Sequence, residues 1–147
     1  MEARVKWIED ERMSAAASSG HAVIMDASDP KQGSSPLEYV LMGLCGCTAS
    51  DVISILKKKR EPFTSLEVSA VAERAAEPPQ VFTKIALLYQ VKGTVSRKSV
   101  EDAVRLSKEK YCSVSAMLAK TAEITTAIAL MPGEGKEAPI SGAVMKT

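Results

Sequence analysis

Residues 35–60 read SPLEYVLMGLCGCTASDVISILKKKR, and this stretch decides the fold. Ser35 supplies a hydroxyl for a helix N-cap, Pro36 suits the first helical position, and Glu38 stands where it completes a capping box. The run continues without another proline to the basic residues 57–60, which suit the C-terminal end of a helix dipole. The pattern therefore predicts one helix of about seven turns.

Strand-like segments flank this helix. Before it, residues 3–8 alternate in polarity, and Ser18-Ser19-Gly20 is typical of a tight turn that leads into a strand at 21–25. After it, residues 66–73 and 81–91 predict an antiparallel pair, joined by a proline-containing connection. The inward face of the second strand is expected to carry Val81, Thr83, Ile85, Leu87, Tyr89 and Val91.

The C-terminal third predicts two helices and a strand. An amphipathic helix is expected over 99–110, a second helix over about 112–120, and a strand over 124–131. Strands, a long helix, strands, helices and a strand in this order indicate an α+β fold. We expect residues 1–131 to form a single domain and 132–147 to form a flexible tail.

Composition narrows the class of protein. The chain has 147 residues, of which 46% are apolar and 25% are charged, as in globular domains. Its net charge of +1 gives no excess of cations for nucleic acid or anionic lipid. The charged start, MEARVKWIEDER, lacks the apolar segment of a signal peptide, and we expect no membrane span, which needs about 20 apolar residues. Three cysteines without a signal peptide indicate the cytoplasm.

Two of the cysteines lie on the long helix. Cys45 and Cys47 are about 200° apart around the helix axis, so they cannot hold one metal ion together. Cys45 shares a stripe of core type, which favours a packing role; its other members are Leu41, Met42, Thr48, Ala49, Val52 and Leu56. The face around Cys47 is small and partly polar and leaves room for a substrate; its residues are Gly43, Leu44, Ser50 and Asp51, with Ser54 further on. Cys47 is therefore the candidate reactive thiol, and the small residues of this helix suggest that a second copy packs across it in a dimer.

The third cysteine, Cys112, lies between two helical patterns in the segment KYCSV. At a helix N-terminus, close to Lys110, the pKa of a thiol is expected to fall. A buried hinge cysteine explains the position equally well. Cys47 lies far from the first turn of its helix, and Asp51 follows one turn later, so its activation needs a cation or donor from elsewhere in the fold.

These residues together resemble a known family. The motif Ser35-Pro36-x-Glu38, followed by Gly43 and Cys47 and by the distant segment Lys110-Tyr111-Cys112-Ser113-Val114, resembles the osmotically inducible protein C (OsmC) and organic hydroperoxide resistance (Ohr) family. Ser19-Gly20-His21 and Asp51-Val52 bring the chain nearest to the YhfA-type branch. The resemblance covers about residues 3 to 130.

The resemblance implies a fold, an assembly and an activity. The fold has antiparallel sheets around a long central helix, in an intertwined homodimer. The activity is thiol-dependent reduction of hydroperoxides, preferably organic ones, in defence against oxidative or osmotic stress. Cys47 would attack the peroxide and become a sulfenic acid, Cys112 would resolve it as a disulfide, and an external dithiol would restore both. No metal and no organic cofactor is implied.

The resemblance also points to supporting residues. In Ohr-type members an arginine and a glutamate hold the reactive thiolate, and the matching positions here are Ser18 and Leu37. Glu38, His21 and Arg12 are the candidates to replace them.

Two other functions remain open on the sequence. The same fold could hold an apolar small molecule without catalysis, with structural thiols. Alternatively, the thiols could form a redox sensor that is oxidised without turnover.

Overall fold

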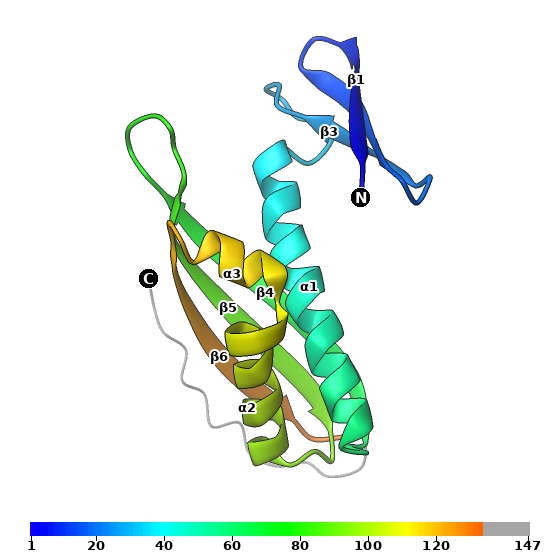
Figure 1. Ribbon diagram of the computed structural model, residues 1–147, viewed down its shortest axis with the longest axis vertical. Helices are drawn as coiled ribbons and strands as arrows, with labels where there is room; N and C mark the ends of the chain where they lie inside the picture. Colours follow the sequence, from blue (N-terminus) through cyan, green and yellow to red (C-terminus); the bar gives the residue numbers. More distant parts are fainter. Residues whose placement is uncertain (134–147) are drawn as a thin grey trace. The chain divides into compact units, whose positions relative to one another are not determined.

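The computed structural model describes residues 1–133, and the tail predicted for 132–147 lies almost entirely outside them. The described chain forms two compact units, Met1–Gly43 and a second that begins at Leu44 (Figure 1). Each unit is described by itself. The elements in chain order are β1 (Ala3–Glu9), β2 (Arg12–Ala17), β3 (Ala22–Asp26), α1 (Pro36–Lys58), β4 (Phe63–Arg74), β5 (Phe82–Gly93), α2 (Arg97–Leu106), η1 (Ser107–Tyr111), α3 (Ser113–Leu118) and β6 (Glu123–Met131).

The first unit contains a three-stranded antiparallel sheet in the order β1-β2-β3. The turn predicted at residues 18–20 is confirmed, because Gly20 adopts a φ of 83° between β2 and β3. A positive φ costs glycine little, since it has no Cβ. All residues of β1 are exposed, including Trp7, which is 68% exposed.

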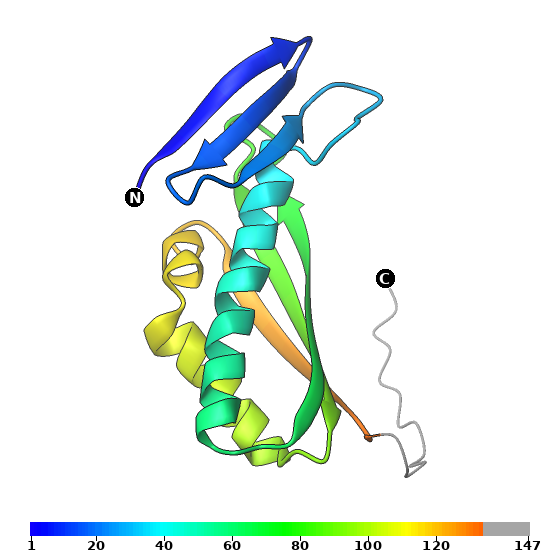
Figure 2. The ribbon, with the colours of Figure 1, turned by 90° about the vertical axis from the view of Figure 1, so that its right-hand side faces the viewer.

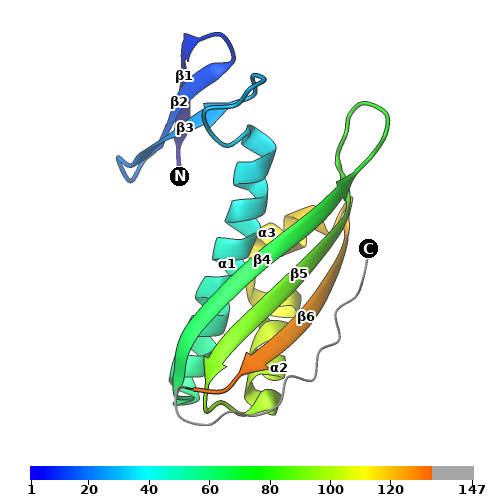
Figure 3. The same cartoon turned by 180° about the vertical axis from the view of Figure 1, so that it is seen from behind.

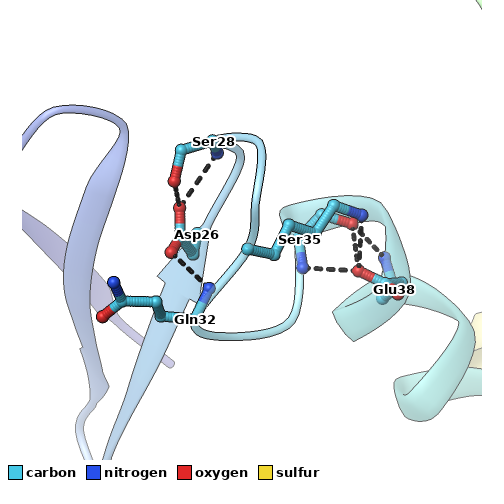
Figure 4. Close-up of polar contacts among 6 residues, drawn as sticks. Asp26, Ser28, Gln32, Ser35 and Glu38 are labelled. Atoms are coloured by element: carbon cyan, nitrogen blue, oxygen red, sulfur yellow. Dashed lines mark hydrogen bonds and ion pairs between the residues drawn. The ribbon is translucent and has the colours of Figure 1, made fainter.

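The start of α1 is fixed by the predicted capping box (Figure 4). The backbone N–H and the hydroxyl of Ser35 both donate to Glu38 Oε2, each at 2.6 Å. The Glu38 N–H donates back to Ser35 Oγ at 3.4 Å. These hydrogen bonds lower the pKa of Glu38 to about 2, with the Ser35 hydroxyl as the main cause. The helix therefore begins at Pro36, as the sequence predicts.

The second unit contains a mixed sheet in the order β4-β5-β6. The predicted antiparallel pairing of β4 with β5 is confirmed. In contrast, β6 runs parallel to β5, because α2, η1 and α3 form a crossover between these strands. Figures 2 and 3 show that the helices of this unit lie on one face of the sheet.

The predicted inward face of β5 is correct over most of the strand and wrong at its beginning. Tyr89 and Val91 are buried, whereas Val81 is 39% exposed. The buried residue at this end is Phe82. The pairing of Glu73 with Lys84 and of Arg74 with Phe82 skips Thr83, so β5 holds one extra residue here and its alternation shifts by one. Thr83, predicted to face inward, is exposed.

The second-unit part of α1 is anchored by a stripe at every fourth residue. Leu44, Val52 and Leu56 are fully buried and Thr48 is 2% exposed. The predicted core stripe is thus confirmed at Thr48, Val52 and Leu56 and wrong at Met42, which is 47% exposed. Leu44 was expected on the small, partly polar side of Cys47 and belongs to the core instead.

The predicted helix over 99–110 begins two residues early and changes geometry before its end. Ser96 caps α2, and Val100, Ala103 and Val104 face the core. From Ser107 the chain widens into the π-helical turn η1, closed by a hydrogen bond from the Cys112 N–H to the Ser107 carbonyl at 2.8 Å. Such turns frequently occur at functional sites.

Helix α1 is more apolar than the sequence analysis allowed. By length and composition it could cross a membrane, with a mean hydropathy of 1.6 over its most apolar window. The expectation that no segment is long and apolar enough to cross a membrane is therefore wrong. Its buried stripe includes Thr48, which bonds to the sheet through Tyr89, and this packing is that of a core helix.

Candidate functional site

The two predicted reactive cysteines lie together in the second unit, with a carboxylate beside them. Cys47 comes from α1, Asp51 lies one turn further along the same helix, and Cys112 precedes α3. The two Sγ atoms and a carboxylate oxygen of Asp51 all lie within 4.8 Å of one another. We call these three residues the thiol–carboxylate cluster. Their catalytic roles remain a prediction.

Cys112 is held by the backbone on both sides. Its φ of −73° and ψ of 101° make it an extended residue between η1 and α3, at the break that the sequence predicts. It serves as the N-cap of α3, and the Ser115 N–H donates to its Sγ at 3.3 Å. The side chain is 3% exposed. The sulfur therefore has a defined position and little contact with solvent.

The prediction of a lowered pKa for Cys112 is wrong. Burial, followed by the hydrogen bond with Cys47, raises its pKa to about 11. The Ser115 N–H acts in the opposite direction but is outweighed. Lys110 was expected to help, but its Nζ lies over the Tyr111 ring, 5.5 Å from the centroid. Burial, which the sequence does not reveal, decides the protonation state of this thiol.

A chain of buried hydroxyl groups leads to the cluster. Thr48 Oγ1 lies 2.7 Å from the Tyr89 hydroxyl and 2.9 Å from Ser107 Oγ. Ser107 Oγ in turn donates to Asp51 Oδ2 at 2.9 Å. Thr48, Ser107 and Tyr89 are all 2% exposed or less.

The donor and acceptor of each hydrogen bond among these hydroxyl groups follow from the carboxylate at which they end, that of Asp51. An ionised carboxylate only accepts, so the Ser107 proton is used on Asp51. Thr48 must then donate to Ser107, and the Tyr89 hydroxyl must donate to Thr48. Burial also raises the pKa of Tyr89, which keeps this donor protonated. The chain therefore orients the Asp51 carboxylate from inside the core.

Cys45 does not belong to the thiol–carboxylate cluster. It is half-buried, as is Cys47, so the expected contrast in burial between the two is weaker than predicted. Desolvation raises the pKa of Cys45. It offers a matched control for experiments on the other two thiols.

The predicted supporting residues all lie in the first unit. Glu38 is engaged in the capping box and in an ion pair with Lys31. Arg12 pairs with Glu9 at 2.9 Å and approaches the buried Asp26 at 3.8 Å. His21 is exposed, and its ring contacts the Ser19 hydroxyl at 3.3 Å. Their support of Cys47 stays a prediction.

The partner of Arg12, Asp26, is a buried carboxylate with several hydrogen bonds of its own. Its carboxylate is fully buried and accepts bonds from the Ser28 hydroxyl and from the backbone N–H groups of Ser28 and Gln32 (Figure 4). These bonds, led by that of the Ser28 hydroxyl, lower the pKa of Asp26 to about 2, and Arg12 adds to the effect. This carboxylate organises the loop before α1.

A cavity adjoins the cluster. It has a volume of about 300 Å³ and shares Asp51 as part of its wall. Mostly apolar surface lines it, and basic groups stand at one part of the wall; the other lining residues are Ser54, Ile55, Lys58, Lys59, Leu106 and Tyr111. Lys59 is paired with Asp102 at 3.1 Å. Pockets with apolar walls and few polar groups are typical of small-molecule sites.

Sequence reasoning missed the polar half of this site. It treated Asp51 as an obstacle to a thiolate, expected Thr48 and Tyr89 only as core residues, and gave Ser107 no part in the site. Ser107 and Asp51 are 56 positions apart, and Thr48 and Tyr89 are 41 apart. The one available signal was a serine on the buried side of an amphipathic helix, since such hydroxyls need a partner.

The fold and the sequence assign the chain to a family. The OsmC-like protein family matches residues 28–127, and the chain belongs to it. It is 44% identical over 126 residues to protein YhfA of Escherichia coli K12, a match that covers 85% of this chain and 94% of the relative.

Solved structures agree. A hypothetical protein from Aquifex aeolicus is 28% identical with a TM-score of 0.83, over 90% of this chain and 97% of the other. The organic hydroperoxide resistance protein OhrB of Bacillus subtilis has the same fold, with a TM-score of 0.61 at 15% identity, over 89% of this chain and 98% of the other. The α+β fold with a central helix is therefore that of OsmC and Ohr proteins.

Proposed function

We propose that the chain is a thiol-dependent hydroperoxide reductase in which Cys47 attacks the peroxide and Cys112 resolves the product. The observation that carries the proposal is the approach of the two Sγ atoms to within 4.8 Å, across 65 positions of sequence. Membership of the OsmC-like family supports the same activity, and several proteins of this fold are named organic hydroperoxide resistance proteins.

The two steps balance without a cofactor. The Cys47 thiol releases its proton and its sulfur attacks the terminal peroxide oxygen; the O–O bond breaks, and the leaving alkoxide takes up that proton and departs as the alcohol. Cys47 is then a sulfenic acid. The Cys112 sulfur attacks the Cys47 sulfur and displaces the oxygen as water, which forms a disulfide. Two electrons from an external dithiol return both thiols.

The half-buried Cys47 and the buried Cys112 divide these roles. Cys47 is the sulfur that a substrate reaches first, since Cys112 is 3% exposed. Asp51 lies close enough to accept the proton that Cys112 must lose before it attacks. The cavity beside Asp51 has apolar walls that suit an organic hydroperoxide.

The same proposal includes a homodimer. Only 22% of the most apolar window of α1 is buried within one chain. The first unit also leaves Val5, Trp7 and Ile8 exposed on one strand. Uncovered apolar surface of this kind marks protein–protein contact sites. Sedimentation equilibrium is expected to give twice the chain mass, and a monomer at micromolar concentration would contradict this part.

A kinetic experiment tests the activity. Purified protein with a dithiol reductant should consume cumene hydroperoxide faster than hydrogen peroxide. Cys47→Ser should abolish turnover, Cys112→Ser should stop after one equivalent with a trappable sulfenic acid, and Cys45→Ser is the matched control that keeps activity. Equal turnover in the Cys47→Ser variant would overturn the proposal.

A second function is favoured by one observation, the raised pKa of Cys112. A thiol that stays protonated resolves a sulfenic acid slowly. If one equivalent of peroxide forms the Cys47–Cys112 disulfide and no dithiol supports further turnover, the protein is a redox sensor. In either function the thiols must be kept reduced, and we place the protein in the cytoplasm.

A further inference from the structure

The thiol–carboxylate cluster also has the composition of a metal site. Zinc binds thiolate sulfur at about 2.3 Å and carboxylate oxygen at about 2.0–2.2 Å, with tetrahedral geometry. These bond lengths place two ligand sulfurs about 3.8 Å apart and a sulfur and an oxygen about 3.5 Å apart. The three ligand atoms here lie within 4.8 Å of one another, so each pair needs to close by about 1.3 Å at most. Small side-chain rotations supply that movement.

The three ligands come from positions that hold them in place. Cys47 and Asp51 are four residues apart on α1, so they share one face of a helix that is anchored on the core. Cys112 approaches from the other side, fixed by the cap of α3 and the last bond of η1. The site therefore joins two separate segments around one point.

Hydrogen bonds from residues outside the thiol–carboxylate cluster orient two of the three ligands. Ser107 donates to Asp51 Oδ2 and leaves Oδ1 available. The Ser115 N–H donates to Cys112 Sγ. Outer contacts of this kind orient metal ligands and tune the metal that they hold. The Tyr89–Thr48–Ser107 chain extends this support into the core.

Charge supplies the reason for a cation. As metal ligands, two thiolates and one carboxylate carry three negative charges, and the three members of the cluster include no cation. A divalent ion offsets two of these charges and displaces the thiol protons on binding. Sulfur ligands select a thiophilic ion of the zinc class over magnesium or calcium.

We infer that the reduced protein binds one zinc-class divalent cation through Cys47 Sγ, Asp51 and Cys112 Sγ, with the fourth coordination position left to water. The inference stands apart from the proposed peroxidase activity, although the two use the same sulfurs. A bound cation holds both thiolates and prevents attack on a peroxide, so the metal-loaded protein is the inactive form.

Cobalt is the probe that tests the ligand set. The full-length protein, reduced with a phosphine and freed of metal, is titrated with Co²⁺, and the complex is then displaced with Zn²⁺ in competition with a chromophoric chelator. We expect one ion per chain and an intense thiolate-to-cobalt charge-transfer band. Cys47→Ser and Cys112→Ser should each lower the band and the affinity, whereas Cys45→Ser should leave both unchanged.

Two further variants test the oxygen ligand and its support. Asp51→Asn should weaken Co²⁺ binding at least as much as Ser107→Ala, for which we expect about a 10-fold loss. Circular dichroism checks that each variant is folded, and the Cys45→Ser variant gives the reference affinity. Unchanged affinity in Asp51→Asn, equal loss in Cys45→Ser, or no charge-transfer band in the wild type would overturn the inference. Peroxide turnover by the metal-free protein is scored separately, so either idea can fail alone.

Discussion

Replacing Thr48 with valine tests the buried hydroxyl chain. Valine keeps the shape of threonine, so the variant leaves no cavity at a position that is 2% exposed. It removes the oxygen that accepts from Tyr89 and the proton that Thr48 donates to Ser107. The Tyr89 phenol, 1% exposed, then keeps an O–H group without an acceptor.

The expected cost follows from these two losses. A buried donor left without a partner costs about 1–3 kcal/mol, and the lost bond to Ser107 about 0.5–1.5 kcal/mol. We therefore expect Thr48→Val to lower the free energy of unfolding by about 2–4 kcal/mol, which is roughly 4–16 °C in Tm for a chain of this size. Tyr89→Phe removes only the terminal donor and should cost about 1 kcal/mol.

The double variant makes the test specific. In Thr48→Val with Tyr89→Phe the orphaned hydroxyl is gone, so the pair should cost less than the sum of the single variants by about 1–2 kcal/mol. Urea unfolding at one fixed protein concentration measures all four proteins. The exposed Thr126→Val is the control, with an expected change within about 0.5 kcal/mol. A Thr48→Val protein as stable as the wild type, or strictly additive variants, would refute the proton directions derived above.

Three other outcomes are expected. Glu38→Gln should lower the Tm in thermal melts, and because the pKa of Glu38 is held at about 2, the carboxylate contributes fully above its ordinary 4.5 and less as the pH falls toward 2; a difference that persists at pH 2 contradicts this. Gly93→Ala should cost more than about 1 kcal/mol in urea unfolding, because Gly93 has a φ of 136° and an added Cβ would lie 2.5 Å from the Pro62 carbonyl; an unchanged midpoint speaks against it. Since burial raises the pKa of Cys112 from 9.0 to about 11, the folded state holds this proton more tightly, and stability should be constant below pH 9 and decrease toward pH 11 in the wild type but not in Cys112→Ser, as paired pH titrations of unfolding would show.

Local chemistry explains why much of the fold was predictable. The capping box of Ser35 and Glu38 fixed the start of α1, and the alternation of β5 identified most of its buried face. Parallel pairing of β6 depends on how a crossover packs, and the exchange of Phe82 for Val81 depends on how β5 pairs with β4, where the register skips Thr83. Neither appears in the pattern of a single segment.

The candidate site was predictable only in part, for the same reason. Helix spacing separated Cys45 from Cys47, and the break before α3 identified Cys112. The position of Asp51 beside both sulfurs and the direction of the Cys112 pKa shift depend on burial and on partners distant in sequence. Physical chemistry predicts these features once the fold is known, but not before.

The π-helical turn η1 sets the directions in which Ser107 and Cys112 point relative to each other. Ser107 and Cys112, five positions apart, would point about 140° away from each other on a regular α-helix. The wider turn lets the Ser107 hydroxyl bond Asp51 while the Cys112 sulfur also lies beside that carboxylate. A regular α-helix over the same residues would leave every side chain of the cluster in the sequence and turn Ser107 and Cys112 away from each other. The wide turn of this short segment is thus as much a part of the site as the identity of its thiols.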